Sequence, residues 1–318
     1  MSWTDRIGRR LKLRDLYTLR VVVDTGSMAQ AAKLLALSQP AISKSIAEIE
    51  HTLGVSLLDR TPRGVVPTPY ANVLLKRGTV IFDDLRQALE EIEHLRDPTQ
   101  GELRVGAPEP LIPLLTVIID DLVSRHPKMH FDVVVADTSL LLGKLRGREL
   151  DIAFTRLPDP VVAADLETEV LYDDPLVVMA GQASPWLRRR RVGLADLAHE
   201  RWTFSPPETL LGRFSAEAFL SRGLTVPSAV VVTQSVQMRV SLVITGRYLS
   251  ILPRAMLRAQ RNASLRALKI DLSETKRPVG VVLLNKRTIG PIANLFIAAA
   301  RQVVSTSRTP SASTKRER

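Results

Sequence analysis

Residues 27–54, with the sequence SMAQAAKLLALSQPAISKSIAEIEHTLG, predict two short helices joined by a tight turn. Ser27 followed three residues later by Gln30 is a capping-box pattern, in which each side chain satisfies a free backbone donor of the helix that begins there. Ser38 is placed to cap the second helix. Pro40 is tolerated behind it because the N–H groups of the first helical turn have no partner within the helix.

The second of these helices has an apolar face and a polar face. Ile42, Ile46, Ile49 and Leu53 recur at helical spacing and predict a buried face. Gly54 marks the end of the helix. On the opposite face, polar side chains gather at the N-terminal end, at Gln39, Ser43 and Lys44.

A short helix, a turn and a second helix with polar side chains at its start form the geometry by which a helix enters the major groove of DNA. Gln39 can pair bidentately with adenine, and Lys44 can reach guanine or a phosphate. The alternative interpretation is an ordinary solvated helix face. The residues of these helices and caps that are predicted to bind DNA are Ser27, Gln30, Ser38, Gln39, Pro40, Ser43 and Lys44.

A helix is expected before this pair and a hairpin after it. Leucines and valines from Leu13 to Val23 recur at the spacing of one buried helical face. Two short apolar runs, 55–58 and 65–66, flank a turn that carries Arg60 and Arg63, which predicts a hairpin wing. We expect both arginines to hold DNA phosphates rather than read bases, because positioning contacts outnumber base contacts.

A long linker helix is predicted over residues 69–100, behind the winged helix-turn-helix of residues 1–68. Thr68 is its expected N-cap, and Pro69 fits the first helical position. Apolar or small residues then alternate at steps of four and three, the pattern of a coiled-coil seam, at Leu74, Gly78, Ile81, Leu85, Ala88, Ile92 and Leu95. We expect dimerisation through Leu74, Ile81, Leu85, Ile92 and Leu95.

From residue 101 the pattern changes to alternating strands and helices, which is typical of parallel α/β sheets. The predicted strands are 102–105, 131–135, 152–154, 176–179, 202–204, 229–232, 249–251 and 279–284. Helices are predicted between them at 111–125, 139–147, 210–222, 235–245 and 291–304. This length is enough for two lobes with a cleft between them. Residues 305–318 are rich in Ser, Thr and Arg and are predicted to form a disordered basic tail.

Residues 31–46, AAKLLALSQPAISKSI, followed by Glu48-Ile49-Glu50 and Leu53-Gly54-Val55, closely resemble the helix-turn-helix of LysR-type regulators. Residues 60–64, RTPRG, and Thr68-Pro69 resemble the same family. Further along the chain, residues 102–106, ELRVG, and 149–153, ELDIA, look like the family's effector-domain strands. The chain departs from the family at Leu58, where Phe is usual, and at Ala71, where Gly is common.

The resemblance implies an effector domain over residues 101–304 with a two-lobed periplasmic-binding-protein-like fold of type 2. The first lobe would combine residues near 101–170 with 273–304, and the second lobe would span about 171–272. The resemblance also implies a sequence-specific transcription regulator that is controlled by a small-molecule effector bound between the lobes. Dimers of such regulators are expected to pair into tetramers.

A ligand site is expected where helices begin at strand ends and face the cleft, because free backbone N–H groups and the helix dipole attract an anion. Positions in this setting are Pro108, Glu109, Thr138, Ser139, Thr155, Arg156, Ser205 and Ser235. Ordinary helix capping is an equally good interpretation of any one of them. Glu109 argues against a plain carboxylate as the effector unless Arg156 dominates the electrostatics.

The amino-acid composition excludes some classes of protein and favours others. The chain has no cysteine, which excludes disulfides and thiol-based sensing. No window approaches the roughly 18 consecutive apolar residues of a membrane span, and the N-terminus lacks a signal-peptide pattern, so we expect a cytoplasmic protein with no membrane partner. The net charge of +11 favours polyanionic partners, and residues 1–80 carry twelve Lys and Arg against six Asp and Glu.

Neither a metal nor a cofactor is predicted. His126 and His130 lie four residues apart, but Pro127 disfavours a shared helix face. Motifs of hydrolases, P-loop proteins, dinucleotide-binding proteins and zinc proteases are absent, so the chain is not expected to be an enzyme. A solute-binding protein would fit the C-terminal two-thirds of the chain but not the basic N-terminal part. The basic run at 188–191 is expected on a solvated loop.

The expected partners are therefore double-stranded DNA with dyad symmetry, a small-molecule effector and further copies of this chain, in a homodimer or homotetramer. RNA polymerase is left open as a further partner.

Overall fold

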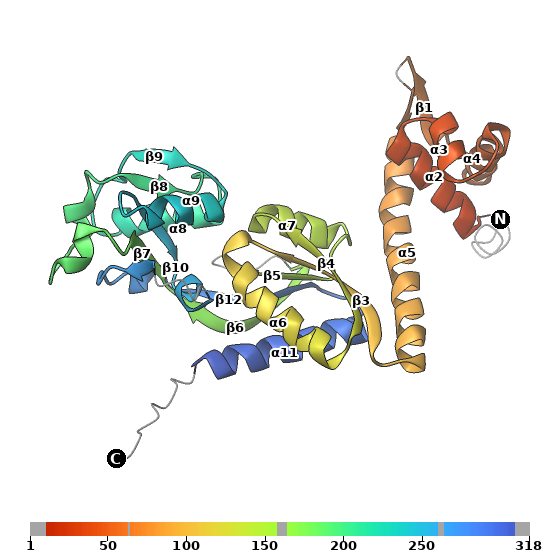
Figure 1. Ribbon diagram of the computed structural model, residues 1–318. Coiled ribbons are helices and arrows are strands. Elements are labelled where there is room, and N and C mark those ends of the chain that lie inside the picture. Colours follow the sequence, from red (N-terminus) through yellow and green to blue (C-terminus); the bar gives the residue numbers. More distant parts are fainter. Residues whose placement is uncertain (1–10, 63, 158–163, 260–263, 309–318) are drawn as a thin grey trace. The chain divides into compact units, whose positions relative to one another are not determined.

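The computed structural model describes residues 11–62, 64–157, 164–259 and 264–308 of the chain. The chain divides into two compact units, one up to Ala88 and the other from Leu89 onward. The boundary falls inside the long helix α5 (Pro69–Arg96), which therefore contributes residues to both units (Figure 1).

The first unit packs short helices and a hairpin around a small apolar core. Its elements before α5 are α2 (Leu13–Thr25), α3 (Met28–Leu34), α4 (Gln39–Leu53), β1 (Leu58–Thr61) and β2 (Gly64–Pro67). The two strands pair in an antiparallel register, with Asp59 opposite Val66. The core contains the buried side chains Leu19, Val22, Ile42, Ile49 and Leu57. This arrangement confirms the predicted winged helix-turn-helix.

The helix ends of this unit follow the predicted local chemistry. The Ser27 hydroxyl accepts a hydrogen bond of 3.3 Å from the N–H of Gln30, which is one half of the predicted capping box. The Ser38 hydroxyl accepts a bond of 3.3 Å from the N–H of Ala41. Gly54 ends α4 at φ +70°, in the left-handed region that favours glycine.

The first wing strand is displaced from its predicted position. The strand spans 58–61 rather than 55–58. The N–H groups of Leu57 and Leu58 donate to Glu50 Oε1 at 2.7 and 3.3 Å. A side chain of α4 thus binds the backbone where a strand partner was expected, and it ties the base of the wing to that helix.

The second unit contains two five-stranded sheets. In spatial order, the first sheet consists of β4 (Lys128–Val135), β3 (Gln100–Ala107), β5 (Ile152–Arg156), β12 (Arg277–Leu284) and β6 (Leu166–Asp174). The second sheet consists of β11 (Leu265–Ala267), β7 (Leu176–Gly181), β10 (Leu249–Pro253), β8 (Trp202–Phe204) and β9 (Ala229–Val232). Each sheet forms one lobe, which confirms the predicted two-lobed fold.

The prediction of parallel sheets was wrong for part of each lobe. The pairs β3–β4, β3–β5, β8–β9 and β8–β10 are parallel. However, β12 runs antiparallel to β5 and β6, and β7 runs antiparallel to β10 and β11. The chain passes from β6 to β7 and later from β11 to β12, each time from one sheet to the other without an intervening α-helix. Strands β7 and β12 therefore enter their sheets antiparallel to neighbouring strands, because no helical crossover sets them parallel.

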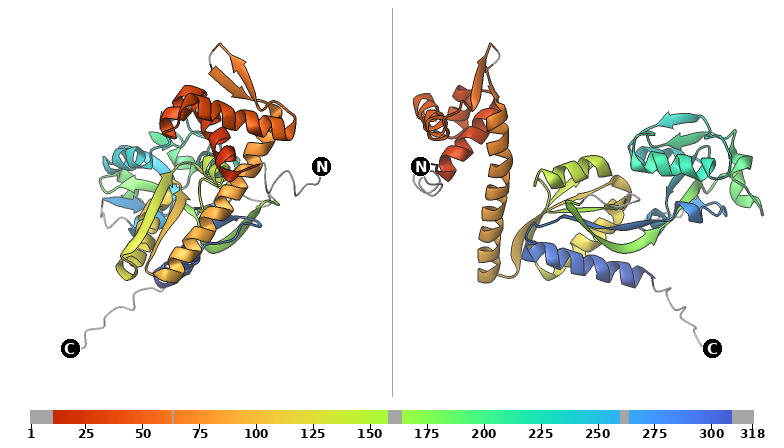
Figure 2. Two further views of the ribbon diagram at one scale, coloured as in Figure 1. Left: turned by 90° about the vertical axis from the view of Figure 1, so that its right-hand side faces the viewer. Right: turned by 180° about the vertical axis from the view of Figure 1, so that it is seen from behind.

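Helices cover both faces of each sheet (Figures 1 and 2). In the first lobe, α6 (Ile112–Arg125) and α11 (Pro291–Arg308) pack against one face of the sheet, where alternate residues of β5 and β12 point. Helix α7 (Thr138–Arg146) packs against the other face, to which the intervening residues of β5 and β12 point. In the second lobe, α8 (Leu210–Leu220) and α9 (Val236–Ile244) pack on opposite faces of β7 in the same manner. Alternate strand residues point to opposite faces, so each sheet has two apolar cores.

The chain passes between the lobes at two adjacent places. Strand β6 ends at Asp174 and β7 begins at Leu176, whereas β12 begins at Arg277. The first sheet thus continues a few residues beyond the expected boundary near 170. The N–H of Leu176 donates to Thr275 Oγ1 at 3.0 Å, which joins the two crossing segments.

Several elements were not predicted from the sequence. They are β6, β11, α10 (Ala255–Ala259) and the short 3-10 helices η1 (Glu109–Leu111), η2 (Pro185–Arg188), η3 (Ala195–Leu197) and η4 (Ser273–Thr275). The predicted disordered tail begins too early, because α11 continues to Arg308. Residues 309–318 of that tail lie outside the described residues. None of the helices in the described part of the chain combines the length and apolar character that a membrane span needs.

Candidate nucleic-acid interface and ligand pocket

The first turns of α4 present polar side chains on a rigid support. Gln39, Pro40, Ser43 and Lys44 are all exposed, as are Gln30 and Ser38, while Ser27 is half-buried. The other face of α4 is anchored by Ile42, Ile46 and Ile49, which are buried in the core of the first unit. The Lys44 ammonium lies 3.9 Å from Glu48 Oε1, and its side chain is 78% exposed. Such an exposed pair is weak, so Lys44 can turn to another anion.

A buried polar contact fixes α4 against α2. Ser45 Oγ donates a hydrogen bond of 2.9 Å to Asp15 Oδ1, and both side chains are buried. Breaking this bond would leave buried polar atoms without it away from water, which disfavours sliding of α4 along α2. The orientation of the exposed face is therefore set from the buried side of the helix.

The wing presents Arg60 from β1 with its side chain exposed. The residue lies in the strand rather than at the tip of the turn. Arg63, the second predicted wing contact, lies outside the described residues.

The predicted seam of α5 has two parts. Leu74 packs against the core of the first unit, and the space beside Gly78 is closed by the side chain of Leu16. From Ile81 onward the seam is exposed, with exposed fractions of 45% for Ile81 and Leu85, 55% for Ile92 and 83% for Leu95. Leu89, which was not predicted, is 54% exposed. A contiguous apolar helix surface of this kind is typical of an interface.

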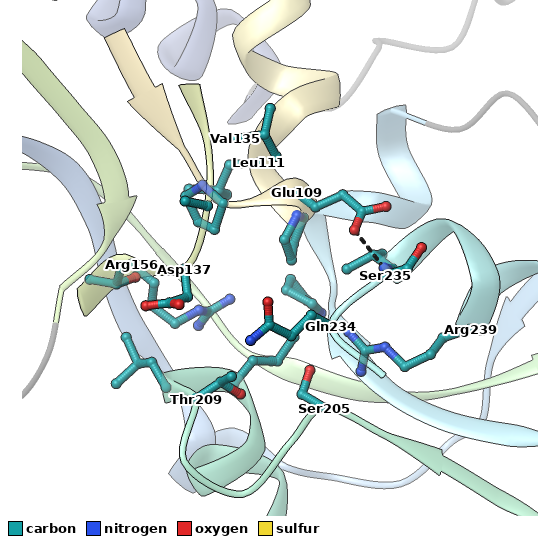
Figure 3. A pocket seen from close by; sticks show the side chains of 18 residues that line it. Glu109, Leu111, Val135, Asp137, Arg156, Ser205, Thr209, Gln234, Ser235 and Arg239 are labelled. Carbon is teal, nitrogen blue, oxygen red and sulfur yellow. Dashed lines mark hydrogen bonds between the residues drawn. The ribbon is translucent and has the colours of Figure 1, made fainter. Parts of the chain in front are cut away.

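A cavity of about 190 Å³ lies between the lobes of the second unit (Figure 3). The predicted ligand positions that line it are Pro108, Glu109, Thr138, Arg156, Ser205 and Ser235. Ser139 and Thr155 do not line it. Ser139 is exposed, and Thr155 is buried with its hydroxyl 2.7 Å from that of Thr138.

The helix N-termini at the cavity are already occupied by protein side chains. Asp137 accepts bonds of 2.8 and 3.1 Å from the N–H groups of Ser139 and Leu140 at the start of α7. Thr209 caps α8 through the N–H of Gly212 at 3.1 Å. The N–H groups of Ser139, Leu140 and Gly212 are therefore already bonded, so a ligand anion at these two helix starts would compete with the caps.

The start of α9 is occupied from the opposite lobe. Glu109 follows β3 in the first lobe, and its two carboxylate oxygens accept bonds of 2.7 Å each from the N–H groups of Val236 and Gln237. Ser235 caps the same helix through the N–H of Met238 at 3.2 Å. Glu109 therefore acts as an internal anion at the helix N-terminus and connects the lobes.

Arg156 is held by an ion pair and is not free for a ligand carboxylate. Its Nη2 donates to Asp174 Oδ2 at 3.0 Å, and its Nη1 donates to the backbone carbonyl of Asp174. Burial lowers the pKa of Arg156, and the neighbouring charge of Asp174 opposes this shift. Asp174 also accepts a bond of 3.1 Å from the N–H of Ala255, so this cluster stabilises the crossing between the lobes.

Arg239 is the cavity residue that sequence reasoning missed. It lies in the second turn of α9, its side chain is fully buried, and none of its three guanidinium nitrogens has a hydrogen-bond partner. Burial lowers the pKa of Arg239 to about 10, against the opposing charge of Glu109, so the group stays protonated at neutral pH. Figure 3 shows the guanidinium pointing from α9 into the cavity, with Gln234 and Ser205 beside it. A signal existed, because Arg239 falls at helical spacing among Val236, Val240 and Val243 on the buried face of α9.

The remaining sequence expectations concern metals and the basic run. His126 follows α6 and His130 lies in β4, and among the described residues no group of three or more His, Asp or Glu could hold a metal ion. The residues at 188–191 are exposed, and the Arg189 guanidinium stacks over the ring of Trp186 at 4.5 Å.

Two family models match the chain. Residues 13–72 match the bacterial regulatory helix-turn-helix protein model of the lysR family, and residues 96–305 match the LysR substrate binding domain model. Together the matched ranges contain the winged helix-turn-helix and both lobes.

Relatives and solved structures agree with these matches. The HTH-type transcriptional regulator GbpR of Azospirillum brasilense is 28% identical over 295 residues, which cover 92% of this chain and 86% of that protein. The fold is similar to that of CbnR, a LysR family transcriptional regulator, with a TM-score of 0.64, 20% identity and coverage of 92% and 99% of the two chains. It is also similar to full-length CbnR complexed with its target DNA, with a TM-score of 0.65, 21% identity and coverage of 92% and 100%.

Proposed function

Because the chain belongs to the LysR family of DNA-binding transcription regulators, we propose that it binds a dyad-symmetric operator through α4 and the β1–β2 wing and responds to a small molecule in the cavity between its lobes. Family membership supports the regulatory activity and the division into a DNA-binding part and a substrate-binding part. It also distinguishes the chain from enzymes with similar folds. The residues that perform each task are this proposal's own assignment.

The observation that carries the DNA-binding assignment is the polar, exposed start of α4 on a buried apolar support. Gln39, Ser43 and Lys44 are exposed and are assigned to base edges, whereas Arg60 and Arg63 of the wing are assigned to phosphates. Half-sites of such an operator should be separated by whole turns of DNA, because two copies of α4 in a dimer must face the same side of the duplex.

The exposed seam from Ile81 to Leu95 supports a homodimer. Its apolar side chains would be covered by the same helix of a second copy. We further propose that dimers associate into tetramers through the second unit and that the regulator acts in the cytoplasm, where it meets DNA and RNA polymerase.

The direct test is selection of DNA sequences by the purified full chain from a random duplex library. We expect enrichment of an inverted repeat with half-sites about 10 base pairs apart, centre to centre, or a multiple of this distance. The Ser43→Ala, Lys44→Ala double variant, taken through the same selection, should enrich a weaker or degenerate motif. Recovery of sequences without any shared motif by the unaltered chain would reject the proposed function.

A further inference from the structure

Arg239 carries a positive charge that the described residues leave without a hydrogen-bond partner. The guanidinium is fully buried, lines the cavity and makes no hydrogen bond through Nε, Nη1 or Nη2. Such a charge is costly to keep away from water unless an anion pairs with it. Because this group lines the cavity and points into it, a ligand inside the cavity can provide that anion.

The other charged groups at the cavity are already engaged. Arg156 is paired with Asp174, Asp137 caps α7, and the two oxygens of Glu109 hold the N–H groups at the start of α9. Glu109 interacts with Arg239 only through space, without a hydrogen bond between them. A ligand anion would therefore complete the pairing of Arg239 without displacing any existing bond.

We propose, on the basis of the proposed function, that Arg239 is the anion-binding residue of the effector pocket and that the effector is a small organic acid with one carboxylate. A guanidinium binds a carboxylate through two parallel N–H donors, which fixes its orientation. A single carboxylate neutralises a single free guanidinium. A dianion such as a phosphate monoester would leave a second negative charge close to Glu109.

The other residues that line the cavity indicate the chemistry of the rest of the ligand. Its walls include Pro108, Pro110, Leu111, Leu210 and Val236, which favour an apolar body. Gln234, Ser205 and Thr209 can bind one or two polar substituents. A volume of about 190 Å³ is smaller than the roughly 300–1,000 Å³ of typical drug-sized pockets, so the ligand should be a compact metabolite.

The acid has residues of both lobes within reach. Its carboxylate would bind Arg239 of α9 in the second lobe, while its body would contact Pro108 and Leu111 of the first lobe. Glu109 already connects these same two elements. Binding would therefore stabilise the arrangement in which the lobes are closed on the ligand, and this differential affinity is what can alter DNA binding.

The test uses calorimetric titration of the full chain with butanoate, hexanoate, phenylacetate and cyclohexanecarboxylate, each beside its primary amide. We expect at least one acid to bind at least about tenfold more tightly than its amide, which has a similar shape but no charge. In the Arg239→Met variant the affinity for that acid should fall at least about 30-fold, because the charged partner is lost at similar side-chain volume. Arg247→Met, an exposed arginine just after α9, is the matched control and should bind as the unaltered chain does.

A second readout separates ligand binding from a structural role. Without ligand, Arg239→Met removes an unpaired buried charge, so the Tm should rise by about 2–4 °C. If Arg239 instead supported the fold, the Tm would fall. A lower Tm together with unchanged acid affinity would overturn the assignment.

The remaining outcomes are also decisive. Equal affinity for acids and amides, or no binding of any of the four acids at millimolar concentration, would overturn the carboxylate effector. Another outcome is a neutral probe that binds and changes operator affinity, and that loses this effect in Leu210→Trp, a variant that fills the pocket. That result would preserve the proposed function and reject the role of Arg239. Loss of sequence-selective DNA binding in the unaltered chain would instead reject the proposed function.

Discussion

The carboxylate of Glu109 in the first lobe accepts a hydrogen bond of 2.7 Å from the backbone N–H of Val236, the first residue of α9 in the second lobe. The second carboxylate oxygen accepts an equal bond from the N–H of Gln237. An ionised side chain at a helix N-terminus is stabilised both by the free N–H groups and by the helix dipole. The lobes are therefore joined beside the cavity by a charge-assisted contact between a side chain of one lobe and the backbone of the other.

Replacing Glu109 by Gln should weaken this junction. The variant loses the negative charge, and its amide NH₂ would face a backbone N–H where an acceptor is needed. We expect the free energy of unfolding of the second unit to fall by about 1–2 kcal/mol. Urea denaturation followed by tryptophan fluorescence, to which the buried Trp202 of the second unit contributes, measures this change. The control is Glu167→Gln, an exposed residue of β6, and equal transition midpoints for the two variants would contradict the predicted role of Glu109.

Much of the fold could be predicted because local chemistry and periodicity agree. Ser38, Gly54 and Thr68 gave the helix boundaries of the first unit, and the structure places caps or a helix end at each of them. Strand β6 was missed because its Glu and Asp residues have low strand propensity and it lies at an exposed sheet edge. The antiparallel pairing of β12 was missed because strand direction leaves no mark on the side-chain pattern.

The position of a cavity between the lobes was predicted, but not the electrostatics of its lining. Strand ends correctly indicated where the cavity lies, since six of the predicted positions line it. Asp137 and Thr209 cap the helices that they directly precede, and sequence reasoning overlooked them. The sequence could not show that Glu109 occupies the N-terminus of α9, because Glu109 reaches that helix from a position 127 residues away in the chain. Arg239 was missed because an arginine in an amphipathic helix is usually assigned to the solvated face.

Variants of α4 and of the wing should affect DNA binding in different ways. Ser43→Ala and Lys44→Ala are expected to weaken operator binding more than binding to scrambled DNA, by about 1–3 kcal/mol each, because base-edge contacts discriminate sequences. Arg60→Ala should weaken both and lower the salt dependence, because a phosphate contact carries no sequence information. Binding titrations at two salt concentrations separate these effects. Equal losses on both DNAs for Lys44→Ala would make it a phosphate contact.

Charges placed in the exposed seam of α5 should prevent dimerisation. The Ile81→Asp, Leu85→Asp double variant would put two carboxylates per chain into an apolar interface without partners. We expect sedimentation to show a shift from dimers or larger assemblies towards monomers, with weaker operator binding. Asn72→Asp is the control, because this exposed residue lies half a turn around the helix from Ile81. Unchanged assembly of the double variant would show that the seam is not the interface.

Thr138 and Ser205 should differ in what their hydroxyl groups support. The Thr138 hydroxyl lies 2.7 Å from that of Thr155 in a buried pair, so Thr138→Val should lower the free energy of unfolding by about 1–2 kcal/mol. Ser205 lines the cavity, so Ser205→Ala should weaken effector binding and leave DNA affinity without effector unchanged. Calorimetry and urea denaturation on both variants test this separation. Unaltered effector affinity in Ser205→Ala would place the ligand elsewhere.

The measurement that tests the central claim most directly is hydrogen exchange of the full chain with and without the selected operator duplex. The account predicts slower exchange of backbone amides in the first turns of α4 and in β1 and β2, where DNA contacts are assigned. Unchanged exchange throughout α4 and the wing, with protection confined to the second unit, would contradict the account.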